Sequence, residues 1–293
     1  MYNNFEFIVT HPDIIKQLAV KDMLLAYYKC PQLEKQVNLF LNYNLITYTF
    51  RGKKTFHHKG RSWVLTDNSC VFVRRAAINQ EKDDFLGWEV LAFYFGDNFL
   101  QQVFREYRHY FPLKNLPPSP ADILIEINVN ETTATFFYGM VPYFTQKIPP
   151  NESLLELKFK ELLFNVLSDP ANAHLLAYVN SIDGQFSTPL WQVMEANYTF
   201  NLTIAEFARI AQRSIASFKR EFHEYYYTSP GKWLTRKRLE YAKFMLDTSK
   251  HNVSEIADES GFENLTHFSR IFKEKYGLSP LQYRKKENGS TTQ

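Results

Sequence analysis

The chain has 293 residues, of which 45% are hydrophobic and 22% are charged. This length suits about two domains, and the composition is that of a globular protein rather than a disordered one. No run of about 18 uncharged apolar residues occurs, so we expect neither a membrane-spanning helix nor a membrane partner. The N-terminus lacks the basic start and apolar stretch of a signal peptide, and two cysteines make no disulfide framework. We therefore expect a cytoplasmic protein.

Positive charge is concentrated at the C-terminal end of the chain. From residue 190 onward there are 16 Lys and Arg residues against 12 Asp and Glu residues, whereas the whole chain has a net charge of +3. A basic excess confined to one segment indicates a polyanionic partner for that segment.

The region 21–95 has the pattern of short β-strands. Segments rich in β-branched and aromatic residues alternate with turns that contain Gly or Asn, which is typical of an antiparallel sandwich or barrel. The strands that we expect cover 44–50, 55–58, 62–66, 69–75 and 89–95.

Helical periodicity takes over after this region. Asp97 is placed to cap a helix over 99–111, and the segments 152–167 and 171–179 also read as helices. The stretch 180–189 contains Gly, Ser and Pro and little periodicity, so we expect a domain boundary there. The sequence thus predicts a first domain over 1–180 that ends in helices at about 152–180, a linker over 181–189 and a second domain over 190–287.

An internal repeat occupies the second domain. Residues 203–233 and 253–283 match at an offset of 49 in their first part and of 50 in their second part. One residue is therefore added between the two helices of the second copy, where Gly261 lies. Two copies are too few for a solenoid but fit a duplicated binding unit.

Each copy reads as a helix, a short turn and a second helix. In the second copy, Ser254 and Asn264 can cap the two helices. Residues four apart share one helix face, so Phe268 and Phe272 form an apolar spine, as do Phe218 and Phe222 in the first copy. A different face of each second helix gathers polar and cationic side chains, namely Ala216, Lys219, Arg220 and His223 in the first copy and Thr266, Ser269, Arg270 and Lys273 in the second.

Such a helix suits the DNA major groove, which admits one α-helix and presents guanine O6 and N7 to an arginine. Ordinary solvated charges are the alternative, but the repetition of Arg two residues after the first spine Phe favours DNA. A helix over 230–247 would hold the two units, 203–227 and 253–277, in successive grooves. Its basic cluster, Arg236, Lys237 and Arg238, could contact phosphates or could simply be solvated.

The segment IADESGFENLTHFSRIFKEKYGLSPLQYR (256–284) resembles the helix-turn-helix pattern of the AraC/XylS family of bacterial transcription regulators. The resemblance covers about 190–286 and implies a tandem helix-turn-helix domain that reads two adjacent major grooves. Carried over residue by residue, it implies base-facing positions at Ala216, Lys219, Arg220, Thr266, Ser269 and Arg270. The first copy departs from the pattern at Gln212, where Gly is usual, and at Tyr226–Tyr227.

The N-terminal half is similar to the cupin-like β-barrel of such regulators. This resemblance implies that 1–180 is a regulatory domain and that its helices at about 152–180 are dimerisation helices. FVRRAAI (72–78) and its continuation into FGDNFLQQVF (95–104) look like the ExsA-type subgroup, in which a protein partner controls activity. The fold that this implies is α+β: a cupin-like antiparallel β-barrel with following helices, then an all-α tandem helix-turn-helix domain. A polar barrel lumen would indicate a sugar-like effector, and a lumen filled with aromatic residues would indicate no small ligand.

No catalytic or metal-binding constellation stands out. His57 and His58 are adjacent in a strand, so their side chains point to opposite faces and do not suit one metal ion. No Gly-rich phosphate loop, HExxH or GxSxG motif occurs. We therefore expect that the protein is not an enzyme and that it binds neither a cofactor nor a metal ion.

The helix 152–167 has more apolar residues than one stripe requires, which leaves core packing and self-association as alternatives. The candidate dimer face is Leu155, Phe159, Leu162 and Val166.

The sequence therefore predicts a DNA-binding transcription activator. We expect it to bind double-stranded promoter DNA, to contact RNA polymerase and to form a homodimer, under the control of a small effector or a regulatory protein. The alternatives are a cupin-type metal enzyme with a DNA-targeting tail and a non-specific architectural DNA binder.

Overall fold

The computed structural model describes residues 2–30, 34–83, 87–183 and 189–289. The chain divides into two compact units, Met1–Thr188 and Pro189–Gln293. We describe each unit by itself. No helix of the described residues is both long enough and apolar enough to cross a bilayer.

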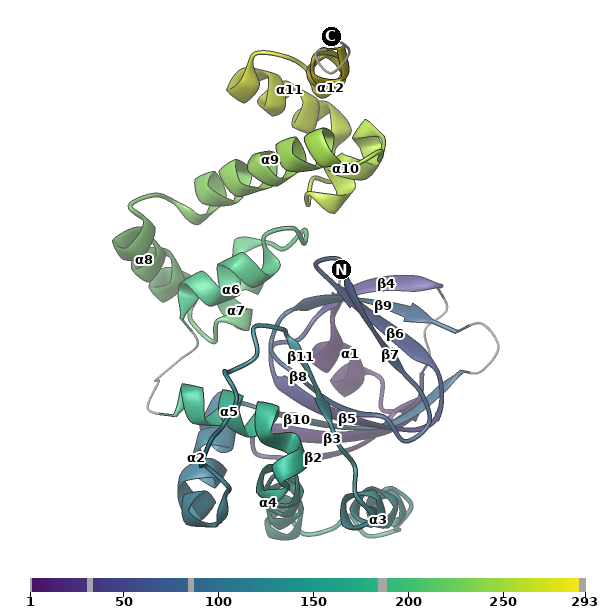
Figure 1. The fold of residues 1–293 in the computed structure, drawn as a ribbon. Helices are drawn as coiled ribbons and strands as arrows, with labels where there is room; N and C mark the ends of the chain where they lie inside the picture. Colours follow the sequence, from purple (N-terminus) through teal and green to yellow (C-terminus); the bar gives the residue numbers. More distant parts are fainter. Residues whose placement is uncertain (1, 31–33, 84–86, 184–188, 290–293) are drawn as a thin grey trace. The chain divides into compact units, whose positions relative to one another are not determined.

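The N-terminal unit contains two mainly antiparallel sheets rather than one closed barrel (Figure 1). The strand order of the six-stranded sheet is β11-β8-β5-β10-β3-β2, and that of the other is β1-β4-β9-β6-β7. The first sheet comprises β2 (Lys16–Val20), β3 (Met23–Lys29), β5 (Asn44–Gly52), β8 (Cys70–Val73), β10 (Trp88–Phe95) and β11 (Leu124–Ile127). The second sheet comprises β1 (Tyr2–Asn3), which pairs in parallel with β4, and β4 (Gln36–Phe40), β6 (Lys54–His58), β7 (Arg61–Leu65) and β9 (Ala77–Lys82).

The chain passes from one sheet to the other at Gly52, between β5 and β6. Gly52 has φ +102°, and a Cβ there would lie 2.2 Å from the carbonyl oxygen of Gly87. Glycine is required here because only glycine tolerates both the dihedral angle and the close approach. The two strands on either side of this turn, β5 and β6, belong to different sheets.

Strand β10 is the centre of the unit and is buried on both faces, as its apolar run indicated. Leu91, Phe93 and Phe95 point into one core and Val90, Ala92 and Tyr94 into the other. The second core lies between the sheets, where Figure 1 shows helix α1 (Asn4–Thr10). Ile8 of this helix belongs to that core.

Helices cover the outer face of the six-stranded sheet (Figure 1). They are α2 (Asp97–Tyr107), α3 (Glu131–Met140), α4 (Glu152–Ser168) and α5 (Ala173–Ile182), with 3-10 turns at Arg108–Tyr110, Val141–Phe144 and Pro170–Asn172. The expected cap of α2 is corrected, because Gly96 is the N-cap and the Asp97 carboxylate instead pairs with Arg75 and accepts from Asn44.

The candidate dimer face on α4 is also corrected. All four of its residues are at most 2% exposed and belong to the core that α4 forms with the sheet. These side chains pack against the sheet, as the core-packing alternative predicts. The buried residues are Leu155, Phe159, Leu162 and Val166.

The C-terminal unit is helical in its described part. Its helices are α6 (Leu190–Asn197), α7 (Ile204–Ile210), α8 (Ile215–Tyr226), α9 (Pro230–Thr248), α10 (Val253–Glu259), α11 (Leu265–Tyr276) and α12 (Pro280–Gly289). Capping boxes open the first helix of each repeat, with Thr203 and Glu206 in one and Asn252 and Glu255 in the other. Asn252 therefore caps α10 in place of Ser254, whereas Asn264 caps α11 as expected.

Candidate DNA-binding interface

The two repeats build the same helix-turn-helix geometry. In the first turn, the backbone N–H of Arg213 donates to the carbonyl of Ala208, and in the second the N–H of Phe262 donates to the carbonyl of Ala257, both at 2.9 Å. The preceding residues also match, since Gln212 has φ +53° and Gly261 has φ +84°. These equivalences place the added residue of the second copy after Phe262, at Glu263.

Helices α8 and α11 are held by their aromatic spines. Phe218 and Phe222 on α8, and Phe268 and Phe272 on α11, are all 0% exposed. Phe222 packs on Trp233 of α9, with 6.0 Å between ring centroids. The α11 pair belongs to a core that also includes Leu239, Ala242 and Leu246 of α9. Each recognition helix therefore rests on its own half of α9.

The six base-facing residues expected on α8 and α11, and Lys273 on the same face of α11, lie away from these spines. Six of them are exposed and Ser269 is half-buried. Each set lies on one helix, on the side opposite to its aromatic contacts, where a nucleic acid could reach it. The exposed residues are Ala216, Lys219 and Arg220 on α8 and Thr266, Arg270 and Lys273 on α11.

Arg270 is held in place by a local ion pair. Its Nη1 lies 2.6 Å from Oε1 of Glu274, and its side chain is 61% exposed. Exposed pairs of this kind contribute only about 0–1 kcal/mol. The guanidinium can therefore exchange Glu274 for a guanine edge at small cost.

The basic cluster on α9 separates into three roles. Arg236 is exposed. Lys237 lies 2.7 Å from Glu195 and stacks over Trp233. Arg238 donates to the backbone carbonyls of Tyr198 and Phe200. Because Arg238 donates to these carbonyls, the expectation that it contacts phosphate is corrected, whereas Arg236 and Lys237 remain candidates for phosphate contacts.

A basic concavity of about 440 Å³ lies where α9 meets α11, and the sequence did not indicate it. Lys232 and Arg236 of α9 line it together with Lys275, whose Nζ donates to the carbonyl of Arg236 and pairs with Glu240. Because 39 residues separate Lys275 from Arg236, no local pattern could reveal the cluster.

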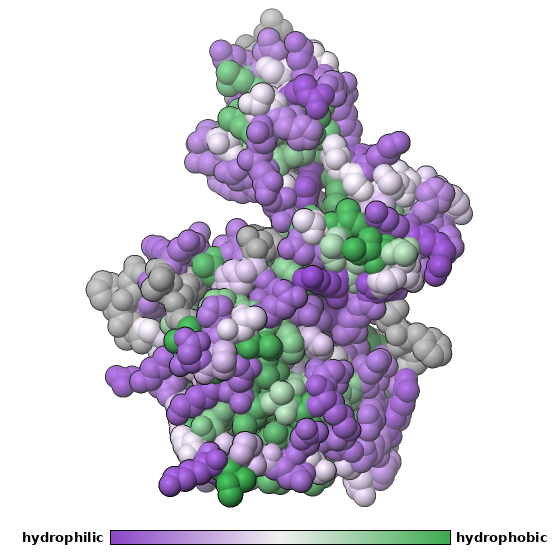
Figure 2. All heavy atoms as spheres, turned by 180° about the vertical axis from the view of Figure 1, so that it is seen from behind, coloured by the Kyte–Doolittle hydropathy of each residue, from purple (hydrophilic) through white to green (hydrophobic). Residues whose placement is uncertain are grey.

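The face of the C-terminal unit that Figure 2 draws is mainly hydrophilic, with small hydrophobic patches.

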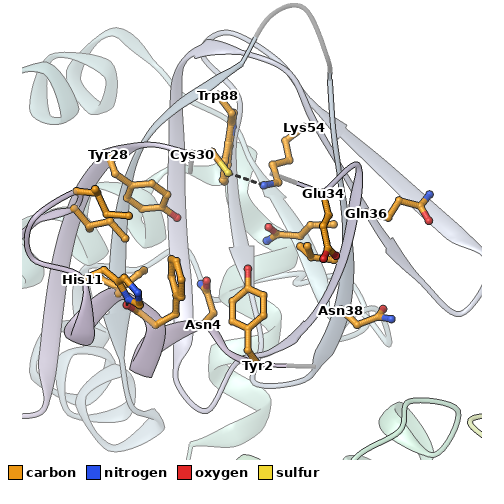
Figure 3. Close-up of a pocket in the computed structure, with 16 residues that line it drawn as sticks. Tyr2, Asn4, His11, Tyr28, Cys30, Glu34, Gln36, Asn38, Lys54 and Trp88 are labelled. Carbon is orange, nitrogen blue, oxygen red and sulfur yellow. Dashed lines mark hydrogen bonds between the residues drawn. The ribbon is translucent and has the colours of Figure 1, made fainter. Parts of the chain in front are cut away.

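A second candidate site is a cavity of about 690 Å³ in the N-terminal unit, lined by α1 and by strands of both sheets (Figure 3). Aromatic rings (Tyr2, Tyr28, Trp88) and polar groups (Asn4, Lys54) share its wall. The cavity wall therefore combines the polar groups expected for a sugar-like effector with the aromatic residues expected if no small ligand binds.

Lys54 is the buried cation of this cavity. It is 1% exposed, its Nζ lies 2.9 Å from Sγ of Cys30 and 4.9 Å from the ring centroid of Trp88 (Figure 3). Burial lowers its pKa below the usual value of a lysine. His57 and His58 lie elsewhere on β6, and His57 contacts Glu81 and Ser62. Among the described residues, no group of three or more His, Cys, Asp or Glu side chains is placed to hold a metal ion.

Comparison with known proteins assigns both halves of the chain. Residues 44–178 match the ExsA N-terminal regulatory domain, and residues 207–286 match a helix-turn-helix domain family. The transcriptional regulator ExsA of Pseudomonas aeruginosa is 23% identical over 272 residues, which cover 92% of this chain and 95% of that protein. This chain is an AraC/XylS-type transcription regulator.

A second curated relative agrees with this assignment. The virulence regulon transcriptional activator VirF of Yersinia enterocolitica is 23% identical over 241 residues, which cover 80% of this regulator and 86% of VirF. Among solved structures, ToxT from Vibrio cholerae is similar to the regulator at 16% identity and a TM-score of 0.41, covering 90% of this chain and 98% of that one.

Proposed function

We propose that the chain activates transcription by placing α8 and α11 in successive major grooves of promoter DNA. The observation that carries this proposal is the pair of exposed arginines, Arg220 and Arg270, at equivalent positions of two equivalent helices that share α9. Arginine recognises guanine through O6 and N7. At 19 residues, α9 is about 28 Å long, close to the roughly 34 Å between successive major grooves on one side of the duplex.

Phosphate contacts would come from the concavity between α9 and α11. Lys232, Arg236 and Lys275 gather positive charge there. Contacts to phosphate fix the register of a protein on DNA and carry no sequence information directly. The name of the Yersinia relative, a transcriptional activator, favours activation over repression and, with it, a contact to RNA polymerase.

A homodimer is part of this proposal, and its face on α4 would use side chains other than the buried four. Leu154 and Leu157 of α4 are 37% and 60% exposed. Exposed apolar residues on one helix are available to a second copy of the chain.

Control through the N-terminal unit would use the cavity around Lys54 if the effector is small. The mixture of aromatic and polar walls suits a compact polar ligand. A thermal-shift screen of the full chain with sugars and small acids tests this. A ligand that raises the Tm of the wild type but not of Lys54→Met supports a small effector. A protein that weakens DNA binding while every small molecule leaves the Tm unchanged supports control by a partner.

The DNA-binding proposal is tested by fluorescence anisotropy with promoter duplex. Arg270→Ala and Arg220→Ala should each weaken binding by about 1–3 kcal/mol. Arg51→Ala is the matched control, because it removes an exposed arginine from the N-terminal unit. Wild-type affinity and selectivity in both helix variants would show that α8 and α11 do not read the bases.

A further inference from the structure

Arg238 links the middle of α9 to the segment that enters the first helix-turn-helix unit. Its Nε donates to the carbonyl of Tyr198 at 2.7 Å and its Nη2 donates to the carbonyl of Phe200 at 2.8 Å. A planar guanidinium can bridge two acceptors in this way, whereas an ammonium is a single point charge. Burial lowers the pKa of Arg238 to about 10, so it remains a cation at neutral pH.

The same entry segment is packed against the turn of the second unit. A Cβ built on Gly261 would lie 2.7 Å from the carbonyl oxygen of Thr199 and 3.0 Å from Nε of Arg238. Gly261 therefore permits a close approach that any larger residue would prevent. The turn of the second unit and the entry of the first unit thus meet at Arg238.

Glu263 completes this junction. Its carboxylate accepts a hydrogen bond from the side-chain amide of Asn201, and its charge acts on Arg238. Glu263 is the residue that the second turn has and the first turn lacks. The difference between the two repeats therefore lies at the point where they touch.

We propose that Arg238, Glu263 and the segment 198–201 form a clamp that fixes the distance and rotation between α8 and α11. Arg238 is then a positioning residue, which sets the spacing of the two half-sites that the protein accepts on DNA. That consequence rests on the proposed function, whereas the clamp itself is a property of the free protein.

Without the clamp, α9 alone would set the distance and rotation between α8 and α11. Each recognition helix contacts its own half of α9, so bending of α9 would move one helix relative to the other. The clamp adds a second, off-axis connection between the units. Two connections restrict a hinge that one connection leaves free.

The first experiment measures the clamp without DNA. Spin labels are placed at the equivalent positions Glu224→Cys and Glu274→Cys of the full chain, in a Cys30→Ser, Cys70→Ala background. The clamp predicts one narrow distance distribution, which broadens at least twofold in Arg238→Met. Glu263→Ala should broaden it as well, and because Glu263 is exposed this variant keeps a readout if Arg238→Met unfolds. An unchanged distribution in the folded variants overturns the clamp.

The second experiment measures the consequence on DNA. The probe is a duplex obtained by selection from randomised DNA, with the interval between its two blocks changed by up to about two base pairs in either direction. The wild type should lose about tenfold or more in affinity away from the selected interval. Arg238→Met and Glu263→Ala should bind a single block within about twofold of the wild type but lose most of the interval preference. Arg238→Lys should fall between, since it keeps charge but bridges one carbonyl only.

The two experiments separate the two proposals. If the labels show a clamp and the wild type binds no two-block DNA, the proposed function fails and the clamp stands. If the wild type prefers one interval and both variants keep that preference, Arg238 is not the positioning residue.

Discussion

Two residues of the first repeat occupy backbone conformations that the second repeat gives to glycine. Tyr227 ends α8 with φ +54°, where Gly277 ends α11 with φ +80°, and Gln212 stands in the turn where Gly261 stands in the second repeat. A residue with a Cβ pays about 1 kcal/mol or more in this left-handed region. The first unit therefore carries backbone strain that the second unit lacks.

The first prediction follows from this strain. Tyr227→Gly should raise the free energy of unfolding by about 0.5–1 kcal/mol, because Tyr227 is 84% exposed and little packing is lost. Urea denaturation followed by circular dichroism measures it. The matched control, Gly277→Ala, should lower stability by a similar amount, since its Cβ would meet nothing within 4 Å. A less stable Tyr227→Gly protein would contradict the account.

The second prediction separates backbone strain from close approach. Gly261→Ala should destabilise the protein more than Gly277→Ala does, by about 1–3 kcal/mol beyond it, because its Cβ would collide with the carbonyl of Thr199. The same urea titration compares the two variants. Equal losses of stability in the two variants would mean that the segment 198–201 moves aside and is not tightly packed against the turn of the second unit.

At the scale of elements, a buried ion pair joins the sheet to the helices of the N-terminal unit. The Arg75 and Asp97 side chains are 4% and 8% exposed, and Asn44 of β5 donates to the same carboxylate at 2.6 Å. Beside it, Arg74 stacks over Tyr178 of α5 at 4.0 Å and donates to the carbonyl of Pro120. Both arginines of FVRRAAI (72–78) therefore connect strands to helices.

The third prediction concerns this pair. Asp97→Ala should lower the free energy of unfolding by about 3–5 kcal/mol, because it removes the carboxylate that compensates a buried guanidinium. Asp122→Ala is the control, since the Arg61 side chain that it pairs with is 62% exposed and such pairs contribute at most about 1 kcal/mol. Thermal unfolding of the two variants compares them. Similar losses would argue against a structural role for the Arg75 pair.

The sequence predicts most elements where periodicity is strong and misses those that tertiary contacts impose. Apolar and β-branched runs mark β5 and β10 correctly, and the Phe spines mark α8 and α11. Helix α1 reads NFEFIVT, which has strand-like composition; Asn3 caps it, and its Ile8 enters the core between the sheets. Sequence pattern could not foresee this, because it holds no information on contacts distant in the chain.

The same limit applies to the candidate site. Exposure of the residues expected to face bases follows from their position relative to the Phe spine, and that position is local. The separate roles of Arg236, Lys237 and Arg238 depend instead on Glu195, Tyr198 and Phe200, about 40 residues earlier in the chain. The sequence of the basic cluster alone therefore does not show which of its three residues is engaged within the protein.

At the scale of the whole molecule, the fourth prediction is the salt dependence of DNA binding. Each lost phosphate contact should reduce the slope of log affinity against log salt concentration by about 1. Arg236→Ala should therefore flatten the slope, whereas Arg238→Met should not, because Arg238 donates to backbone carbonyls. Anisotropy titrations at several salt concentrations measure both. A slope that changes equally in the two variants would contradict the separate roles.

The most direct test of two equivalent readers is selection of bound duplexes from randomised DNA by the full chain and its variants. The account predicts two preferred sequence blocks with centres about 10–10.5 base pairs apart. Arg220→Ala should relax selection in one block only, and Arg270→Ala should relax selection in the other. A single block, or two variants that relax the same positions, would contradict the account.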